Sequence, residues 1–72
     1  MRRESLELLG RILDQLDDDK RAVFVLYEIE ELTMKDVADA VGCPLQTAYS
    51  RLHAARRLVS EALADLERRR GT

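Results

Sequence analysis

A glycine and a proline stand two residues apart near the middle of the chain, and they divide it into separate helical segments. Gly42 follows an apolar repeat and is predicted to end a helix, because glycine readily adopts the left-handed conformation found after a helix C-terminus. Pro44 cannot continue a helix, but its fixed φ angle suits the first turn of the next one. The sequence therefore predicts a tight turn between two helices at residues 42–44.

Apolar residues recur at intervals of three and four on both sides of this turn, as expected for helices with one buried face. Before the turn, Thr33 is the predicted N-cap of a short helix whose buried side consists of Met34, Val37, Ala38 and Val41. After it, a long helix is predicted from about Pro44 to Arg69, with the buried stripe Leu45, Ala48, Leu52, Ala55, Val59, Ala62 and Leu66. The small side chain of Ala38 would let the two helices cross closely.

Two further helices are predicted in the first half of the chain. The first spans about residues 4–16 and would bury Leu6, Leu9, Ile12, Leu13 and Leu16. The second spans about residues 18–29, is capped by an aspartate at 17–19, and would bury Ala22, Val23, Leu26 and Ile29. Because β-branched and aromatic residues are sparse, the predicted fold is all-α: four helices with a central helix-turn-helix and a long C-terminal recognition helix. The 72 residues suffice for a single domain, without a β-wing.

Charge is distributed unevenly along the chain, although its net charge is only −2. Residues 1–43 carry six basic and eleven acidic side chains, whereas residues 44–72 carry six arginines and three acidic side chains. No acidic residue lies between Pro44 and Ser60, a segment that contains three arginines and a histidine. Because phosphates respond to the local field, we expect this segment to face DNA and the acidic half to face away.

A helix-turn-helix places its second helix in the major groove, where side chains near the helix N-terminus reach the base edges. The face of the long helix opposite its apolar stripe carries the predicted contacts: Gln46, Thr47, Tyr49, Ser50, Arg51, His53, Arg56 and Arg57. Gln and Arg offer the bidentate geometries that match adenine and guanine, whereas Thr and Ser reach either base edges or phosphates. This face is therefore predicted to read a DNA duplex.

Three stretches of the sequence carry a more specific resemblance. Residues 16–24 (LDDDKRAVF) and 32–38 (LTMKDVA) resemble region four of bacterial RNA polymerase sigma factors. Residues 42–56 (GCPLQTAYSRLHAAR) are similar to the signature of the extracytoplasmic-function (ECF) group. The resemblance implies binding to the promoter −35 element, docking on the flap of the RNA polymerase β subunit, and an anti-sigma factor as a further partner.

The resemblance also implies roles for individual residues. The positions that match the family's base-proximal residues are Tyr49, Ser50, His53 and Ala54. The positions that match backbone or nearby contacts in the family are Arg21, Arg51 and Arg56.

The chain departs from the family pattern at several positions. Tyr49 and Ala54 stand where basic residues are frequent, Glu31 stands where glycine is common, and Asp17 stands where proline is frequent. No part of the sequence resembles region two, which melts the −10 element. The resemblance therefore implies an excised C-terminal domain or a standalone region-four protein.

The sequence contains no pattern typical of an enzyme or a cofactor site. It has no nucleophile with an evident base, no Gly-rich phosphate loop and no metal-ligand spacing, so neither catalytic nor metal-binding residues are predicted. The lone Cys43 is predicted to be a small buried hydrophobic residue. With no signal peptide and no membrane-spanning run, a cytoplasmic protein is expected.

Two other functions fit the same pattern. A LuxR-type output domain also has four helices with a central helix-turn-helix, but usually binds paired half-sites as a dimer. A helical protein-interaction module could use the basic helix to bind an acidic partner without reading DNA. The oligomeric state stays open, because Val59, Leu63 and Leu66 could pack on the first helix or on a partner.

Overall fold

The computed structural model describes residues 3–70, apart from the side chains of Ser5 and Arg70, and these residues contain helices and no strand. In chain order the elements are α1 (Arg3–Asp14), α2 (Asp18–Phe24), the π-helical turn η1 (Val25–Ile29), α3 (Met34–Val41) and α4 (Leu45–Arg70). The predicted all-α fold with a central helix-turn-helix is confirmed. The first helix ends two residues earlier than expected, and the second changes from α-helical to π-helical geometry at Val25.

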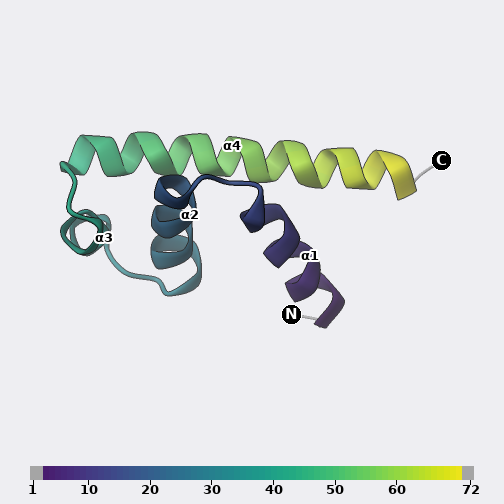
Figure 1. Ribbon diagram of the computed structural model, residues 1–72, viewed down its shortest axis with the longest axis horizontal. Helices are drawn as coiled ribbons and strands as arrows, with labels where there is room; N and C mark the ends of the chain where they lie inside the picture. Colours follow the sequence, from purple (N-terminus) through teal and green to yellow (C-terminus); the bar gives the residue numbers. More distant parts are fainter. Residues whose placement is uncertain (1–2, 71–72) are drawn as a thin grey trace.

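The long helix α4 runs along one side of the molecule, and α1, α2 and α3 all lie on the same side of α4 (Figure 1). Helices α2 and α3 pack against the first half of α4, and α1 reaches it further along. This arrangement makes the molecule elongated, with principal extents of 43 × 21 × 16 Å.

The helix ends are formed by the residues that the sequence predicts. Asp17 accepts a hydrogen bond from the backbone N–H of Lys20 at 2.9 Å and caps α2. Thr33 caps α3 by accepting from the backbone N–H of Asp36 at 3.1 Å. Gly42 follows α3 in the left-handed region at φ 73°, as expected. Pro44 lies one residue before α4 rather than within it, and its carbonyl accepts from the N–H of Ala48.

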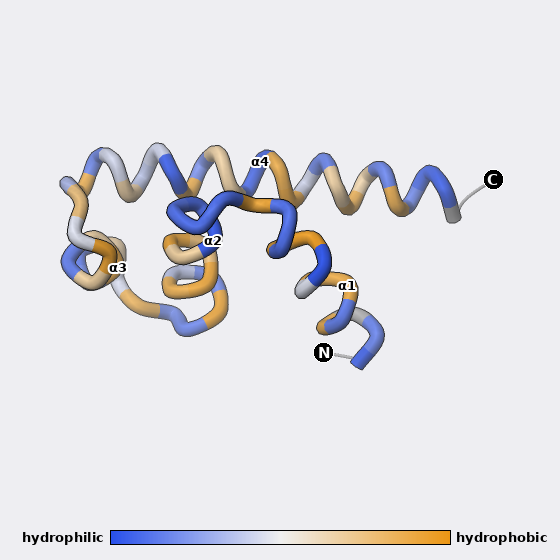
Figure 2. Tube along the Cα trace, in the orientation of Figure 1, coloured by the Kyte–Doolittle hydropathy of each residue, from blue (hydrophilic) through white to orange (hydrophobic). Residues whose placement is uncertain are grey.

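The core lies where α2, α3 and the end of α1 meet the apolar stripe of α4, and each of these helices carries hydrophobic segments (Figure 2). Its buried members are Ile12, Leu13, Leu16, Val23, Phe24, Met34, Val37, Ala38, Ala48, Leu52, Ala55 and Val59. Leu66 is partly buried against this core, whereas Leu63 is 40% exposed.

Three residues predicted to be buried are exposed instead. Leu6 is 54% exposed, since only the C-terminal half of α1 contributes residues to the buried core. Ile29 is 49% exposed, because the wider π-helical turn breaks the α-helical register that would place it on the buried face. Leu45 is 47% exposed, since it is the first residue of α4 and projects beyond the core.

The connection between η1 and α3 consists of residues 30–33. Glu31 has φ 61°, and it is the one non-glycine residue with positive φ in the described part of the chain. The backbone thus keeps the left-handed conformation expected of the glycine that is common at this position in the resembled family. For an L-residue this conformation is unfavourable, because Cβ approaches the following carbonyl oxygen.

We expect Glu31→Gly to raise the free energy of unfolding by about 1 kcal/mol, because glycine adopts the left-handed conformation without that clash. The matched control is Glu30→Gly, since Glu30 has φ −87° and gains nothing from glycine. Urea denaturation followed by circular dichroism measures both variants. Equal destabilisation of the two variants would show that position 31 is not strained.

The cap at Asp17 predicts a pH dependence of stability. The hydrogen bonds from the Lys20 side chain and backbone lower the pKa of Asp17 below its usual 3.8, and the nearby Arg51 charge adds to this. A carboxyl with a lowered folded pKa stabilises the fold above its unfolded pKa and loses that contribution as pH falls through the folded value. We therefore expect the thermal midpoint to decrease when the pH is lowered below about 4. The decrease should be smaller in Asp17→Asn, whose amide oxygen still caps α2. An equal decrease of the thermal midpoint at acid pH in both proteins would contradict this assignment.

Candidate nucleic-acid interface

Helices α3 and α4 contact each other and form the helix-turn-helix. Ala38 of α3 and Ala48 of α4 are 5% and 0% exposed, and both belong to the buried core. Beyond Gly42, the backbone N–H of Cys43 donates to the carbonyl of Ala38 and closes the turn. Cys43 itself is half-buried against the core, in line with a small hydrophobic residue.

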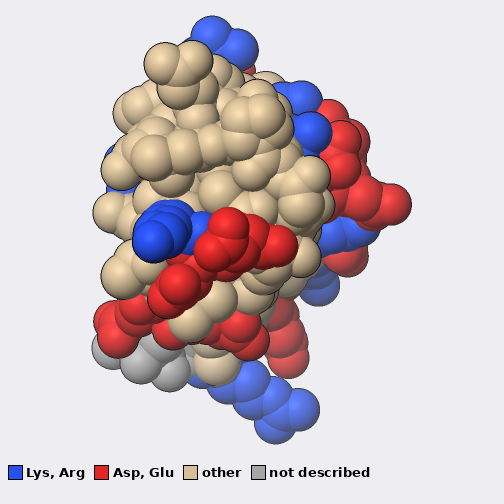
Figure 3. Space-filling model, turned by 90° about the vertical axis from the view of Figure 1, so that its left-hand side faces the viewer, with Lys and Arg blue, Asp and Glu red and all other residues tan. Residues whose placement is uncertain are grey.

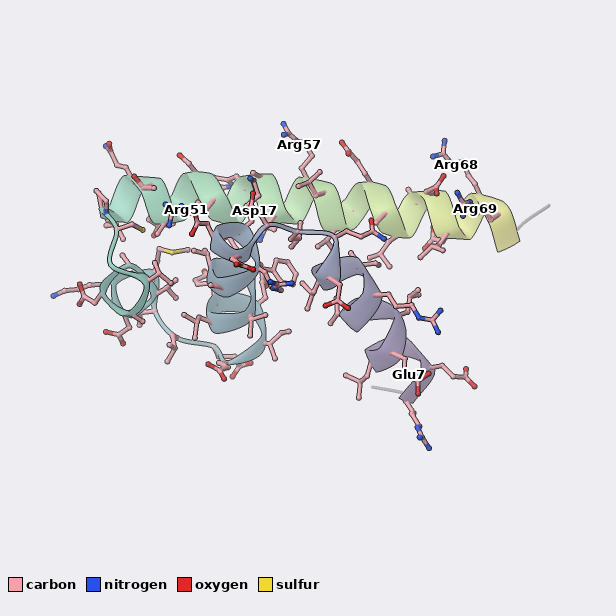
Figure 4. All side chains as sticks on the ribbon, in the orientation of Figure 1. Glu7, Asp17, Arg51, Arg57, Arg68 and Arg69 are labelled. Carbon is pink, nitrogen blue, oxygen red and sulfur yellow. The ribbon has the colours of Figure 1, made fainter. Side chains whose placement is uncertain are left out.

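The outer face of α4 presents a mostly uncharged polar surface. With 3.6 residues per turn, Gln46, Ser50 and Arg57 lie opposite the buried stripe, and all three are exposed. Thr47 is half-buried beside them. The Arg57 side chain points away from the other helices (Figure 4). This face thus holds polar groups that can reach a groove and one arginine directed toward solvent.

Two aromatic side chains extend this outer face. The rings of Tyr49 and His53 stack with their centroids 6.5 Å apart and their planes inclined by 24°. Both residues are exposed, and they lie one helical turn apart between the outer face and the flank that carries Arg56. Gln46, Ser50 and Arg57 therefore share the outer face, with Thr47 half-buried on one side of it and Tyr49 and His53 exposed on the other.

The remaining three predicted arginines turn toward acidic side chains of the domain. Arg21 contacts the carboxylate of Asp18 within α2. Arg51 places a guanidinium nitrogen 3.7 Å from a carboxylate oxygen of Asp19, and in Figure 4 it lies near Asp17 at the start of α2.

Arg56 turns toward the π-helical turn η1. Its Nε donates to the carboxylate of Glu28, and its guanidinium carbon lies 5.6 Å from the ring centroid of Tyr27. Both partners belong to η1, so Arg56 links the flank of α4 to the π-helical turn.

Two carboxylates from the acidic half of the chain lie beside the basic helix. Asp19 of α2 contacts Arg51, and Glu28 of η1 contacts Arg56. The end of the molecule where α3 lies and α4 begins is largely uncharged at the height of α4, with acidic side chains gathered below and on one flank (Figure 3). The chain separation of 28 residues between Glu28 and Arg56 concealed this pairing in the sequence.

No group of three or more His, Cys, Asp or Glu side chains in residues 3–70 could hold a metal ion. Within the same residues, no helix combines the length and the apolar character needed to cross a membrane.

Comparison of the sequence with known proteins places the chain in a family. The family model described as "Sigma-70, region 4" matches residues 6–59, which include the helix-turn-helix and most of the exposed face described above. The chain belongs to the sigma-70 region 4 family. This membership confirms the resemblance drawn from residues 16–24, 32–38 and 42–56, and favours it over a LuxR-type output domain.

Relatives of this region 4 chain include two kinds of sigma factor. The RNA polymerase sigma-H factor of Pseudomonas aeruginosa is 35% identical over 69 residues, covering 94% of the chain and 36% of that protein. The ECF RNA polymerase sigma-E factors of Salmonella typhimurium and Escherichia coli K12 are each 29% identical over 66 residues, covering 92% of the chain and 35% of those proteins. The chain thus spans about a third of the length of these curated relatives. No solved structure matches it significantly.

Proposed function

We propose that this region 4 chain acts in transcription initiation as one helix-turn-helix domain that reads the promoter −35 element from the major groove. The observation that carries the proposal is the exposed face of α4, on which Gln46, Tyr49, Ser50, His53 and Arg57 lie together next to the turn from α3. A helix presented in this way fits the major groove with its N-terminal half against the base edges. The names of the relatives, all RNA polymerase sigma factors, support the same role.

The side chains of this face divide by chemistry into three groups. Gln46 and Ser50 offer hydrogen-bonding groups to base edges, and the Tyr49–His53 ring pair offers apolar area together with polar ring atoms. Arg57 offers a directed positive charge, the group that typically contacts a phosphate. In this proposal Arg21, Arg51 and Arg56 contact the backbone at the margins of the interface.

We further propose that the DNA contact is assisted by attachment to RNA polymerase. The arginine–carboxylate pairs of α2 and η1 neutralise much of the basic character of α4, so the isolated domain is expected to bind DNA weakly. Docking on the β-subunit flap would raise the effective DNA concentration and remove the need for high intrinsic affinity. We also propose an anti-sigma factor that covers the same surfaces as a further partner. The proposed location of the protein is the cytoplasm.

The experiment that tests DNA reading is an amide NMR titration with two duplexes at equal salt, one carrying an ECF-type −35 element and one with that element scrambled. We expect the largest shifts at residues 46–57 and stronger shifts with the −35 duplex. Equal shifts with both duplexes would reduce the contact to electrostatics. No shifts at low salt would favour a protein-interaction module over a DNA reader.

Arg57→Ala is expected to weaken duplex binding and to lower the salt slope of log K by about 1, the value for one lost phosphate contact. The matched control is Arg68→Ala, because Arg68 also points outward from α4 but lies three turns further along it (Figure 4). Fluorescence anisotropy at several salt concentrations measures both variants. If the two substitutions lower affinity and slope equally, Arg57 makes no specific phosphate contact.

A further inference from the structure

The contact between Arg56 and η1 bears on how the domain would engage DNA. The Arg56 guanidinium is held from two sides, by the Glu28 carboxylate and by the face of the Tyr27 ring. A guanidinium paired in this way presents little net charge to an approaching phosphate. The side chains of Arg56 and Glu28 are nevertheless 46% and 32% exposed, so a phosphate can approach the pair from solvent.

Arg51 repeats this arrangement on the other flank of α4. Its nearest acidic partner is Asp19, with a nitrogen-to-oxygen distance of 3.7 Å, and Asp19 is 72% exposed on its side chain. The two flanks of the recognition helix therefore each carry an arginine with an acidic partner from α2 or η1. Partly exposed pairs of this kind contribute little to stability, so a stronger partner can replace the carboxylate.

We propose that Glu28 and Asp19 set the DNA affinity of this domain by competing with phosphates for Arg56 and Arg51. The inference rests on the proposed DNA-binding function and adds two carboxylates that limit the DNA affinity. When a phosphate takes the arginine, the released carboxylate stands uncompensated beside the DNA and attracts a cation. The release of a counterion from DNA is then partly cancelled, which lowers both the affinity and its salt dependence.

The test compares Glu28→Gln with Glu30→Gln in duplex binding by fluorescence anisotropy. Glu30 is exposed two residues further along the chain, and no ion pair of its side chain is found within residues 3–70. Both variants remove one negative charge, but only the first removes the partner of Arg56. We expect Glu28→Gln to bind about five-fold more tightly than Glu30→Gln, the scale of one partly exposed ion pair, with a salt slope steeper by about 1.

A second pair of measurements guards against a change in folding. Asp19→Asn is expected to raise affinity in the same direction, and the thermal midpoint of each variant shows whether the fold is intact. In the double variant Glu28→Gln with Arg56→Ala the gain in DNA affinity should disappear, because the guanidinium that Glu28→Gln would free is absent. A gain that persists without Arg56 would overturn the proposal, since it would then reflect only the lost negative charge.

A measurement without DNA completes the test. The Nε–H of Arg56 is expected to give a slowly exchanging NMR signal in the unmodified chain and to lose this protection in Glu28→Gln.

If the unmodified chain binds the duplex but Glu28→Gln binds no more tightly than Glu30→Gln, the competition proposal fails and the DNA-binding function stands. If no variant binds either duplex at low salt, both proposals fail.

Discussion

The apolar stripe of α4, centred on Leu52 and on the two alanines Ala48 and Ala55, holds the other helices in place. These three side chains are between 0% and 2% exposed, and α1, α2 and α3 all contact the helix that carries them. The alanines let neighbouring helices approach closely, while burial of a leucine contributes about 2 kcal/mol. One long helix thus supports the fold with one face and leaves the opposite face exposed, the face that we propose reads DNA.

This dual use of α4 has an electrostatic consequence. Because α2 must pack on the buried stripe, its acidic N-terminus and the following π-helical turn lie beside the flanks of the recognition helix. Arg51 and Arg56 therefore have carboxylates near them before DNA is present. Arg57 lies outside this arrangement and points away from the helices below (Figure 4).

The link between η1 and α3 shows how backbone geometry persists when the residue type changes. Glu31 adopts the left-handed conformation of a glycine because the turn must bring Thr33 to the start of α3. The π-helical turn just before it exposes Ile29 and brings Tyr27 and Glu28 within reach of Arg56. The geometry of a five-residue turn thus determines which side chains meet the recognition helix.

The sequence by itself determined the helices, their caps at Asp17 and Thr33, the turn at Gly42 and the family. These features depend on local rules, namely apolar periodicity, capping chemistry and a motif within one segment. Only the tertiary structure decided the π-helical turn, the exposure of Leu6 and Ile29, and the pairing of Arg56 with Glu28. Those outcomes depend on how helices pack, and packing brings together charges that lie far apart along the chain and that no local pattern records.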